Sequence, residues 1–133
     1  MLILDSFEKA IQSLSIVLKE REIHPDNLFV RDAAIQRFEY TYEISHKMLK
    51  RHLEATSPTP TEIDGMSFQN IIRTGSERGL LLNGWEKWRL YRTSRGTTSH
   101  AYDEKKALQV LEIIPDFYEE AKHLLASLKE NNT

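Results

Sequence analysis

Apolar residues recur every three or four positions along three long parts of the chain, residues 7–18, 35–53 and 107–128. This spacing places the apolar side chains on one face of an α-helix. No segment shows the alternation of apolar and polar residues that is typical of a half-buried strand. The pattern therefore predicts an all-α fold, an antiparallel four-helix bundle built from four to five helices with short connections.

Breaks in this pattern set the expected helix boundaries. Residues 24–27 (His-Pro-Asp-Asn) separate the first two helices, and the second helix is expected over residues 28–55. Residues 56–65 contain two prolines and an Asp-Gly pair, which predicts a loop. Asp5, followed three positions later by Glu8, has the spacing of a capping box at the start of the first helix.

The later helices also carry boundary signals. Ser67 is expected to cap a short helix, and Trp85 to begin another. Pro115 lies inside the last apolar stripe and should kink or split that helix, because proline lacks a backbone N–H and clashes with the preceding turn. Trp85, Trp88 and Tyr91 follow one another at helical spacing, which favours a place in the core over a base-stacking surface.

Length and composition narrow the class of protein. The chain has 133 residues, 40% of them hydrophobic, and these values fit one globular domain over residues 1–133. It has no cysteine, which excludes disulfide scaffolds, thiol catalysis and cysteine-bound zinc. The net charge of −2 excludes a protein that coats nucleic acid through bulk charge. The apolar run at the N-terminus is too short for a membrane span, so we expect a soluble, cytoplasmic protein that does not contact a membrane.

One segment differs from this acidic background. From Lys87 to Lys106 the chain carries six basic and two acidic residues. A positive patch in an acidic protein indicates that an anion binds there. Four residues of this segment are candidates for binding a phosphate group or RNA, namely Arg92, Thr97, Thr98 and Ser99.

Arg95 and His100 are the candidate catalytic residues of this segment. Gly96 and the three residues after it are poor helix formers, so the helix should end just after Arg95. On an unbroken helix the side chains of Arg95 and His100 would lie about 140° apart around the axis, and a break would let them converge. Histidine exchanges protons near neutral pH, and arginine offers a permanent charge to phosphate oxygens. The pair suits metal-independent cleavage of a phosphodiester, with the 2′-hydroxyl of the RNA itself as nucleophile.

A second interpretation of the same pair is structural. Arg95 would then interact with the C-terminus of its helix, where cations are favoured, and His100 would be an ordinary loop residue. In the catalytic interpretation one histidine does not readily serve as both base and acid, and a symmetric dimer would supply the second group. The spacing alone leaves both interpretations open.

Two Glu-x-x-His pairs, Glu43–His46 and Glu120–His123, have the spacing that di-iron helical bundles use. His123 is expected to face water, and no matching inward glutamates are expected on the other helices, so neither a metal nor another cofactor is expected. Gly75-Ser76 is similar to the opening of a nucleotidyltransferase signature. No Asp-x-Asp follows it to hold magnesium, so the chain is not expected to be that enzyme itself.

Charged residues also interrupt the apolar pattern of the long second helix, at Arg31, Arg37, Glu39 and Glu43. They form either a solvated face, with charge pairs one helical turn apart, or a set that lies at a dimer cleft and orients the loop after Arg95.

Two blocks of the sequence resemble the HEPN superfamily and, within it, the branch of nucleotidyltransferase substrate-binding proteins, or HepT-like toxins. The first block, residues 31–43 (RDAAIQRFEYTYE), is similar to the signature second helix of that branch. The second block, Arg95-x4-His100-x-Tyr102, is similar to its Arg-x4-His-x-Tyr motif. The resemblance implies an antiparallel helical bundle that forms a homodimer, with the two motif loops at a cleft between the subunits.

The resemblance also implies a function. Arg95 and His100 would carry ribonuclease activity on RNA, and a cognate small nucleotidyltransferase would act as the antitoxin by transferring AMP to Tyr102. The chain departs from the family pattern at Gly96, where many members have Asn, Asp or Glu. This departure motivates an alternative function, a non-catalytic substrate-binding subunit of a two-component nucleotidyltransferase. A third interpretation is a helical bundle with a structural role only.

Overall fold

The computed structural model describes residues 2–132 of the chain, and every regular element in this range is a helix. The all-α prediction is thus confirmed, with six α-helices in these residues where four to five were expected. Met1 and Thr133, the ends of the predicted 1–133 domain, lie outside the described residues. The elements are α1 (Asp5–Ile23), α2 (Leu28–Thr56), α3 (Pro60–Asp64), α4 (Phe68–Glu77), α5 (Trp85–Thr97), the 3₁₀ turn η1 (Thr98–His100) and α6 (Glu104–Glu130).

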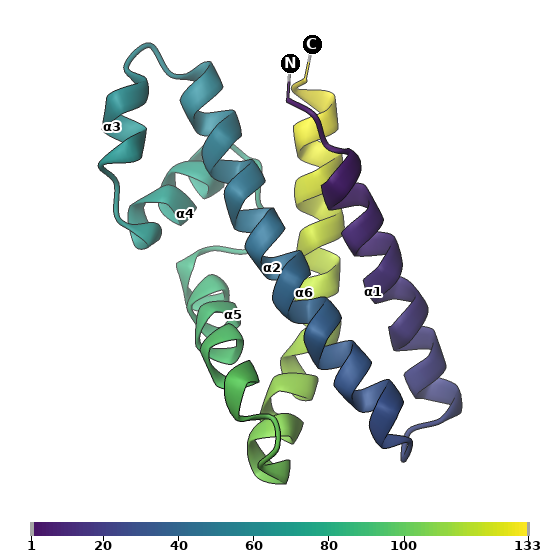
Figure 1. Cartoon of the computed structure of the whole chain (residues 1–133). Coiled ribbons are helices and arrows are strands. Elements are labelled where there is room, and N and C mark those ends of the chain that lie inside the picture. Colours follow the sequence, from purple (N-terminus) through teal and green to yellow (C-terminus); the bar gives the residue numbers. More distant parts are fainter. Residues whose placement is uncertain (1, 133) are drawn as a thin grey trace.

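The three long helices α1, α2 and α6 lie side by side, with α1 antiparallel to both of the others (Figure 1). The short helices α3 and α4 lie beside the C-terminal part of α2, and α5 runs along the N-terminal half of α6. The two ends of the described range lie together: Asn132 accepts a hydrogen bond from the Leu2 N–H at 2.9 Å and donates one to the Leu2 carbonyl at 2.8 Å. The turn between α5 and α6, which contains η1, is at the opposite end of the molecule.

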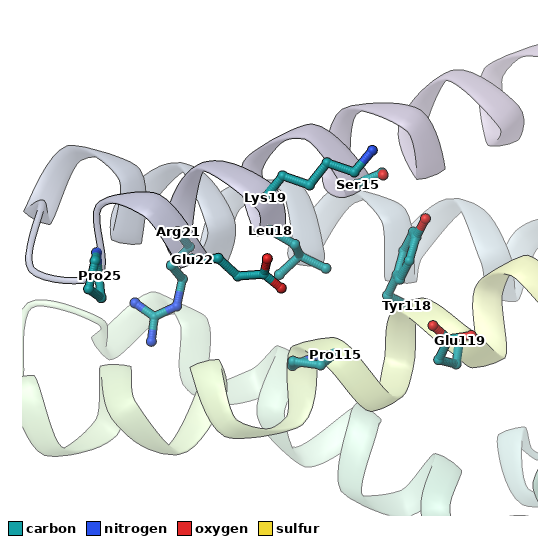
Figure 2. A pocket seen from close by; sticks show the side chains of 9 residues that line it. All are labelled: Ser15, Leu18, Lys19, Arg21, Glu22, Pro25, Pro115, Tyr118 and Glu119. Carbon is teal, nitrogen blue, oxygen red and sulfur yellow. The ribbon is translucent and has the colours of Figure 1, made fainter.

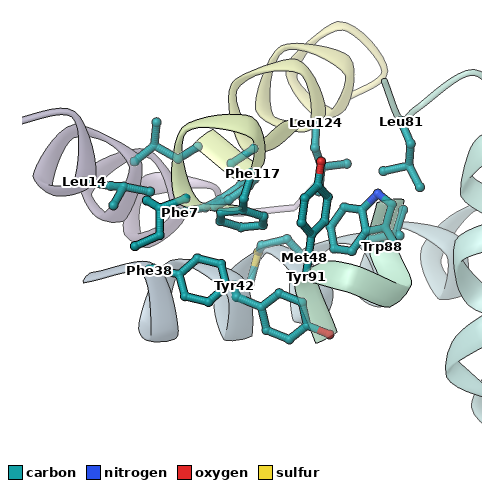
Figure 3. Close-up of a cluster of buried hydrophobic side chains, with 14 of the residues drawn as sticks. Phe7, Leu14, Phe38, Tyr42, Met48, Leu81, Trp88, Tyr91, Phe117 and Leu124 are labelled. Atoms are coloured by element: carbon teal, nitrogen blue, oxygen red, sulfur yellow. The ribbon is translucent and has the colours of Figure 1, made fainter. Parts of the chain in front are cut away.

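The core is centred on a group of aromatic side chains from α2, α5 and α6 (Figure 3). Phe117 of α6 lies edge-on to Phe38 at 5.2 Å and to Tyr91 at 5.3 Å between ring centroids, and Trp88 lies edge-on to Tyr91 at 5.3 Å. All four rings are fully buried. Edge-to-face pairs of this kind add to the free energy gained from burial alone. The prediction that Trp88 and Tyr91 belong to the core is confirmed, whereas Trp85 is half-buried against Phe68.

Helix boundaries agree with the sequence in some places and differ in others. Helix α2 has the predicted bounds to within a residue, and Ser67 caps α4 by accepting the Asn70 N–H. The predicted capping box is wrong, because α1 already includes Asp5 and its N-cap, Leu4, has no side-chain acceptor. The predicted loop over residues 56–65 contains α3, which Pro60 begins at a position where a missing N–H has no cost.

Pro115 does not split the last helix. Helix α6 continues through it from Glu104 to Glu130, with Ile114 and Phe117 fully buried on either side. The Pro115 ring is exposed and faces α1, so packing on the opposite face of the helix is undisturbed (Figure 2). Burial of these neighbours offsets the lost hydrogen bond, so the predicted split is wrong, while the alternative of a kink at Pro115 stays a prediction. No helix within residues 2–132 is both long and apolar enough to cross a membrane.

Candidate functional site

The basic segment forms the end of α5, the turn η1 and the short link to α6. Helix α5 continues two residues past the predicted end at Arg95, and Gly96 is helical. The helix then tightens into the 3₁₀ turn η1. The hydroxyl group of Thr97 donates to the Thr93 carbonyl at 3.1 Å, and that of Ser99 lies 3.4 Å from the Gly96 carbonyl. These hydroxyl groups compete for the last carbonyls of the helix, which explains why the helix changes its geometry here.

Arg95 is held by a contact from α2. Its Nε donates to Oε1 of Glu43 at 2.7 Å, an ion pair between residues 52 positions apart in the sequence. The Arg95 side chain is one-third exposed, so the guanidinium group still reaches solvent. The neighbouring Arg92 lies over the ring of Phe68, 4.7 Å from its centroid, as a cation–π pair. Both arginines are therefore positioned by side chains outside α5.

A second contact from α2 fixes η1 itself. The hydroxyl oxygen of Thr98 lies 2.5 Å from Oε2 of Glu39 and 2.7 Å from the Arg95 carbonyl. Thr98 is buried, and this hydroxyl group is engaged within the chain. Glu39 and Glu43 lie one turn apart on α2, so one face of that helix holds both Arg95 and Thr98. These contacts of Glu39 and Glu43 agree with an orienting role for charged residues of the second helix, and their place at a dimer cleft stays a prediction. Arg37 instead donates to the Ser13 carbonyl at 2.8 Å.

His100 and Tyr102 are on the outer side of this turn. The Tyr102 hydroxyl oxygen lies 3.5 Å from Nδ1 of His100, and the Tyr102 side chain is 85% exposed. Asp103 then caps α6 by accepting the N–H groups of Lys105 and Lys106. Within residues 2–132 the side-chain contacts of Arg95 and His100 are with different residues, Glu43 and Tyr102. Within residues 2–132 no hydrogen bond joins Arg95 to His100, and the expected convergence of the two side chains stays a prediction.

His46 is a residue near this site that the sequence suggested only as a metal ligand. It is half-buried and lies edge-on to Phe68, 4.7 Å between ring centroids, on the ring that also carries Arg92. Burial lowers the pKa of His46 below its usual value, and the positive charges of Lys50 and Arg92 lower it further against the opposing effect of Glu43. The imidazole is therefore neutral at pH 7.

Glu120 has a structural role in place of the metal role considered for it. Its buried carboxylate accepts the N–H of Leu82 at 2.7 Å, the N–H of Asn83 at 2.8 Å and the indole N–H of Trp88 at 2.8 Å. Burial raises the pKa of Glu120, and the three donors oppose that rise. The carboxylate fixes the chain between α4 and α5. Within residues 2–132 no group of three or more His, Cys, Asp or Glu side chains is placed to hold a metal ion.

Two concave regions of the surface are relevant. The first has a volume of about 390 Å³ and lies between α1 and α6, where Leu18, Pro115 and Tyr118 are among its lining residues (Figure 2). None of the predicted site residues lines it. The second has a volume of about 640 Å³ and lies between the start of α2 and residues 95–102, called the motif turn below. Thr98, Tyr102 and Glu39 are among its lining residues.

Comparison with known proteins identifies the family. A family model described as nucleotidyltransferase substrate binding protein like matches residues 2–130. The chain belongs to this family. The assignment agrees with the branch indicated by the residue 31–43 block and the Arg95-x4-His100-x-Tyr102 motif, and it places the chain among the HepT-like proteins.

Individual relatives of this HepT-like protein support the same assignment. A Haemophilus influenzae protein named probable ribonuclease HepT is 40% identical over 99 residues, which are 74% of this chain and 67% of the relative. A solved structure from Haemophilus influenzae, described as the fold of a substrate-binding domain of a nucleotidyltransferase, matches with a TM-score of 0.88 at 32% identity over 96% of this chain and 99% of that one. A crystal structure from Thermus thermophilus matches with a TM-score of 0.71 at 34% identity over 92% and 98% of the two chains.

Proposed function

We propose that this HepT-like protein is a metal-independent endoribonuclease in which Arg95 and His100 carry the reaction. The main support for this proposal is that side chains of α2 hold the motif turn in place. Glu43 and Glu39 of α2 hold Arg95 and Thr98, while the imidazole of His100 is left exposed at the surface. A relative that is 40% identical bears the name probable ribonuclease, which points to the same class of reaction.

The chemistry follows from the two side chains. The 2′-oxygen of the RNA attacks the adjacent phosphorus, a 2′,3′-cyclic phosphate forms, and the bond from phosphorus to the 5′-oxygen breaks. One His100 removes the proton from the 2′-hydroxyl, and a second His100 donates a proton to the leaving 5′-oxygen. Arg95 stabilises the negative charge that gathers on the phosphate oxygens in the transition state.

A homodimer is part of this proposal, because each chain has a single motif histidine. His100 and Tyr102 are exposed at the end of the molecule formed by the α5–α6 turn, where a second copy has access to them. A two-fold axis near this turn would bring two motif loops to one phosphodiester. Each chain would then supply one Arg95 and one His100.

We further propose that a cognate nucleotidyltransferase regulates the site, as in a toxin–antitoxin pair. The exposed Tyr102 hydroxyl would attack the α-phosphate of ATP in the partner's active site, so that a bond forms between Tyr102 and AMP and pyrophosphate leaves. The phenolic proton passes to the partner. Because the Tyr102 oxygen lies 3.5 Å from His100, the added phosphate would lie next to the imidazole and exclude the phosphate of RNA.

The second candidate function is a non-catalytic subunit that presents a substrate to the nucleotidyltransferase. Two observations favour it: Gly96 stands where many family members have a polar residue after Arg95, and the Nε of Arg95 is already engaged by the Glu43 carboxylate. In that case the motif turn would bind the partner or its substrate without cleaving RNA.

The test is cleavage of single-stranded RNA by the purified protein in the presence of EDTA. We expect cleavage to a 2′,3′-cyclic phosphate, and a loss of at least about a hundredfold in rate for His100→Ala and for Arg95→Ala. His24→Ala is the matched control, because His24 is exposed in the turn between α1 and α2. Equal cleavage by wild type and His100→Ala would overturn the catalytic assignment, and tight binding to the partner without any cleavage would favour the second function.

Modification is tested separately, by intact-mass measurement after co-expression with the nucleotidyltransferase. A mass increase by whole AMP units is expected for the wild type and for Tyr40→Phe, which alters another partly exposed tyrosine. No increase is expected for Tyr102→Phe. An AMP adduct on Tyr102→Phe would show that the modified residue is a different one.

A further inference from the structure

The cavity of about 640 Å³ beside Tyr102 has the size of a small-molecule site. It lies between the first three turns of α2 and the turn that follows α5. Its lining combines one arginine, two carboxylates, an amide and two aromatic rings, and the residues used below are Phe29, Arg31, Asp32, Gln36, Glu39 and Tyr102. The proposed ribonuclease reaction assigns none of the first four a role.

Arg31 is the unusual member of this lining. Its side chain is only 16% exposed, and its Nε is buried with no hydrogen-bond partner within residues 2–132. The nearest carboxylate oxygen in an ion pair with it is Oδ1 of Asp32, at 3.6 Å from Nε. Burying the Nε–H of a guanidinium group with so weak a contact is costly, because this N–H has lost water without gaining matched acceptors. An anion that enters the cavity would supply those acceptors.

Two aromatic rings on the cavity are exposed to water. Phe29 is 87% exposed and Tyr102 is 85% exposed, and both line the cavity. Exposed aromatic side chains beside a basic group are the usual means by which proteins stack unpaired bases, since every base has a flat face. The two rings therefore favour a ligand with a planar base.

The carboxylates restrict the ligand further. Asp32 and Glu39 leave the lining with more acidic than basic side chains, which disfavours a triphosphate or pyrophosphate. Carboxylate oxygens and the Gln36 amide instead accept hydrogen bonds from the exocyclic amino groups of adenine, cytosine and guanine. Uracil has no such group. A nucleotide with one phosphate and an amino-bearing base fits this combination.

We propose that this cavity is a nucleotide subsite that takes one unpaired nucleotide of the RNA substrate. Arg31 binds a phosphate of that nucleotide, Phe29 and Tyr102 stack on its base, and the carboxylates select a base with an amino group. This inference rests on the proposed ribonuclease function, which identifies the ligand as RNA. It adds a requirement on the substrate: the RNA must have an unpaired nucleotide next to the bond that is cut.

The direct test is calorimetric binding of AMP, ribose 5-phosphate and adenosine to the full chain. We expect Arg31→Gln to lower the affinity for AMP and for ribose 5-phosphate by about tenfold or more and to leave the affinity for adenosine unchanged. Phe29→Ala should weaken AMP and adenosine but not ribose 5-phosphate. The control is Arg73→Gln, which removes an exposed charge on α4 and should bind all three as the wild type does. AMP binding that is unchanged in both Arg31→Gln and Phe29→Ala would overturn the subsite.

Cleavage kinetics separate this inference from the proposed function. With short oligonucleotides, Arg31→Gln should raise KM about tenfold with little change in kcat, because Arg31 binds a nucleotide and does not act at the reacting phosphate. RNA cleavage that needs His100 but is the same in Arg31→Gln would refute the subsite and leave the ribonuclease intact. If AMP binding depends on Arg31 but the protein cleaves no RNA, the subsite stands and the ribonuclease function is refuted. The natural occupant of the cavity would then be the AMP group attached to Tyr102.

Discussion

Arg95 of α5 donates from Nε to the Glu43 carboxylate of α2 at 2.7 Å, and this contact joins the two sequence blocks of the family across 52 positions. Arg95 therefore does not simply cap the C-terminus of its own helix, which was the structural interpretation of the residue. The contact fixes where the guanidinium group lies relative to the motif turn. The contact engages Nε alone, so the terminal N–H groups of the guanidinium remain for a substrate phosphate.

Glu43→Gln tests whether this contact positions Arg95 for the reaction. The amide keeps the shape of the side chain but loses its charge, so Arg95 is held less firmly and we expect the rate of RNA cleavage to fall by about tenfold. The free energy of unfolding should change by less than about 1 kcal/mol, because the pair is partly exposed. Glu112→Gln, at an exposed position on α6, is the control. An unchanged cleavage rate in Glu43→Gln would mean that Arg95 is positioned by other contacts.

Glu120→Gln should destabilise the protein by about 1–3 kcal/mol, as measured by urea unfolding. The carboxylate accepts three N–H groups through both of its oxygens, and an amide has only one oxygen to offer. Its NH₂ group would then face an N–H of the α4–α5 link. Glu119→Gln, one position away and exposed, should change the free energy of unfolding by no more than about 0.5 kcal/mol. Equal stability of the two variants would contradict the role of Glu120.

The pH dependence of stability should reveal His46. Burial lowers its pKa in the folded state below the ordinary value of 6.5, so the unfolded chain binds the proton more readily. The stability that neutral His46 contributes is complete above the unfolded pKa and is lost as the pH falls below it. His46→Gln should therefore lose less unfolding free energy than the wild type between about pH 7.5 and about pH 5.5.

Two other buried groups also affect how stability depends on pH, but both are present in the wild type and in His46→Gln. Burial also lowers the pKa of His52, which acts in the same direction, and it raises the pKa of Glu120, which acts in the opposite one. His24→Gln, which alters an exposed histidine, is the matched control. A His46→Gln curve that parallels the wild type would show that His46 is not buried in its neutral form.

Replacement of two glycines by alanine should change the free energy of unfolding in opposite directions. Gly79 has φ of 71°, a conformation in which a Cβ is strained, so Gly79→Ala should destabilise the protein by about 1–2 kcal/mol. Gly96 is helical, and a Cβ added there meets nothing within 4 Å, so Gly96→Ala should stabilise it by about 0.5–1 kcal/mol. Thermal unfolding of the two variants checks both signs. A destabilised Gly96→Ala would show that the end of α5 needs the flexibility of glycine.

The sequence by itself determined the helical class, the positions of the three long helices, the bounds of α2 and the family. Apolar residues at helical spacing bury one face of each helix whatever the topology, and turn residues such as those at 24–27 end a helix through local backbone chemistry. The place of Trp88 and Tyr91 in the core followed from the same periodicity. The motif from Arg95 to Tyr102 was visible because its residues are close in the sequence.

The tertiary structure alone decided what each polar side chain contacts. Helix packing brings Glu43 to Arg95 and Glu39 to Thr98, leaves the Nε of Arg31 buried beside a cavity, and turns Glu120 toward a distant loop. It also keeps α6 continuous through Pro115, because buried neighbours on both sides offset one lost hydrogen bond. Such contacts join residues that are far apart in the sequence and depend on the relative orientation of whole helices, and local periodicity carries no information about that orientation.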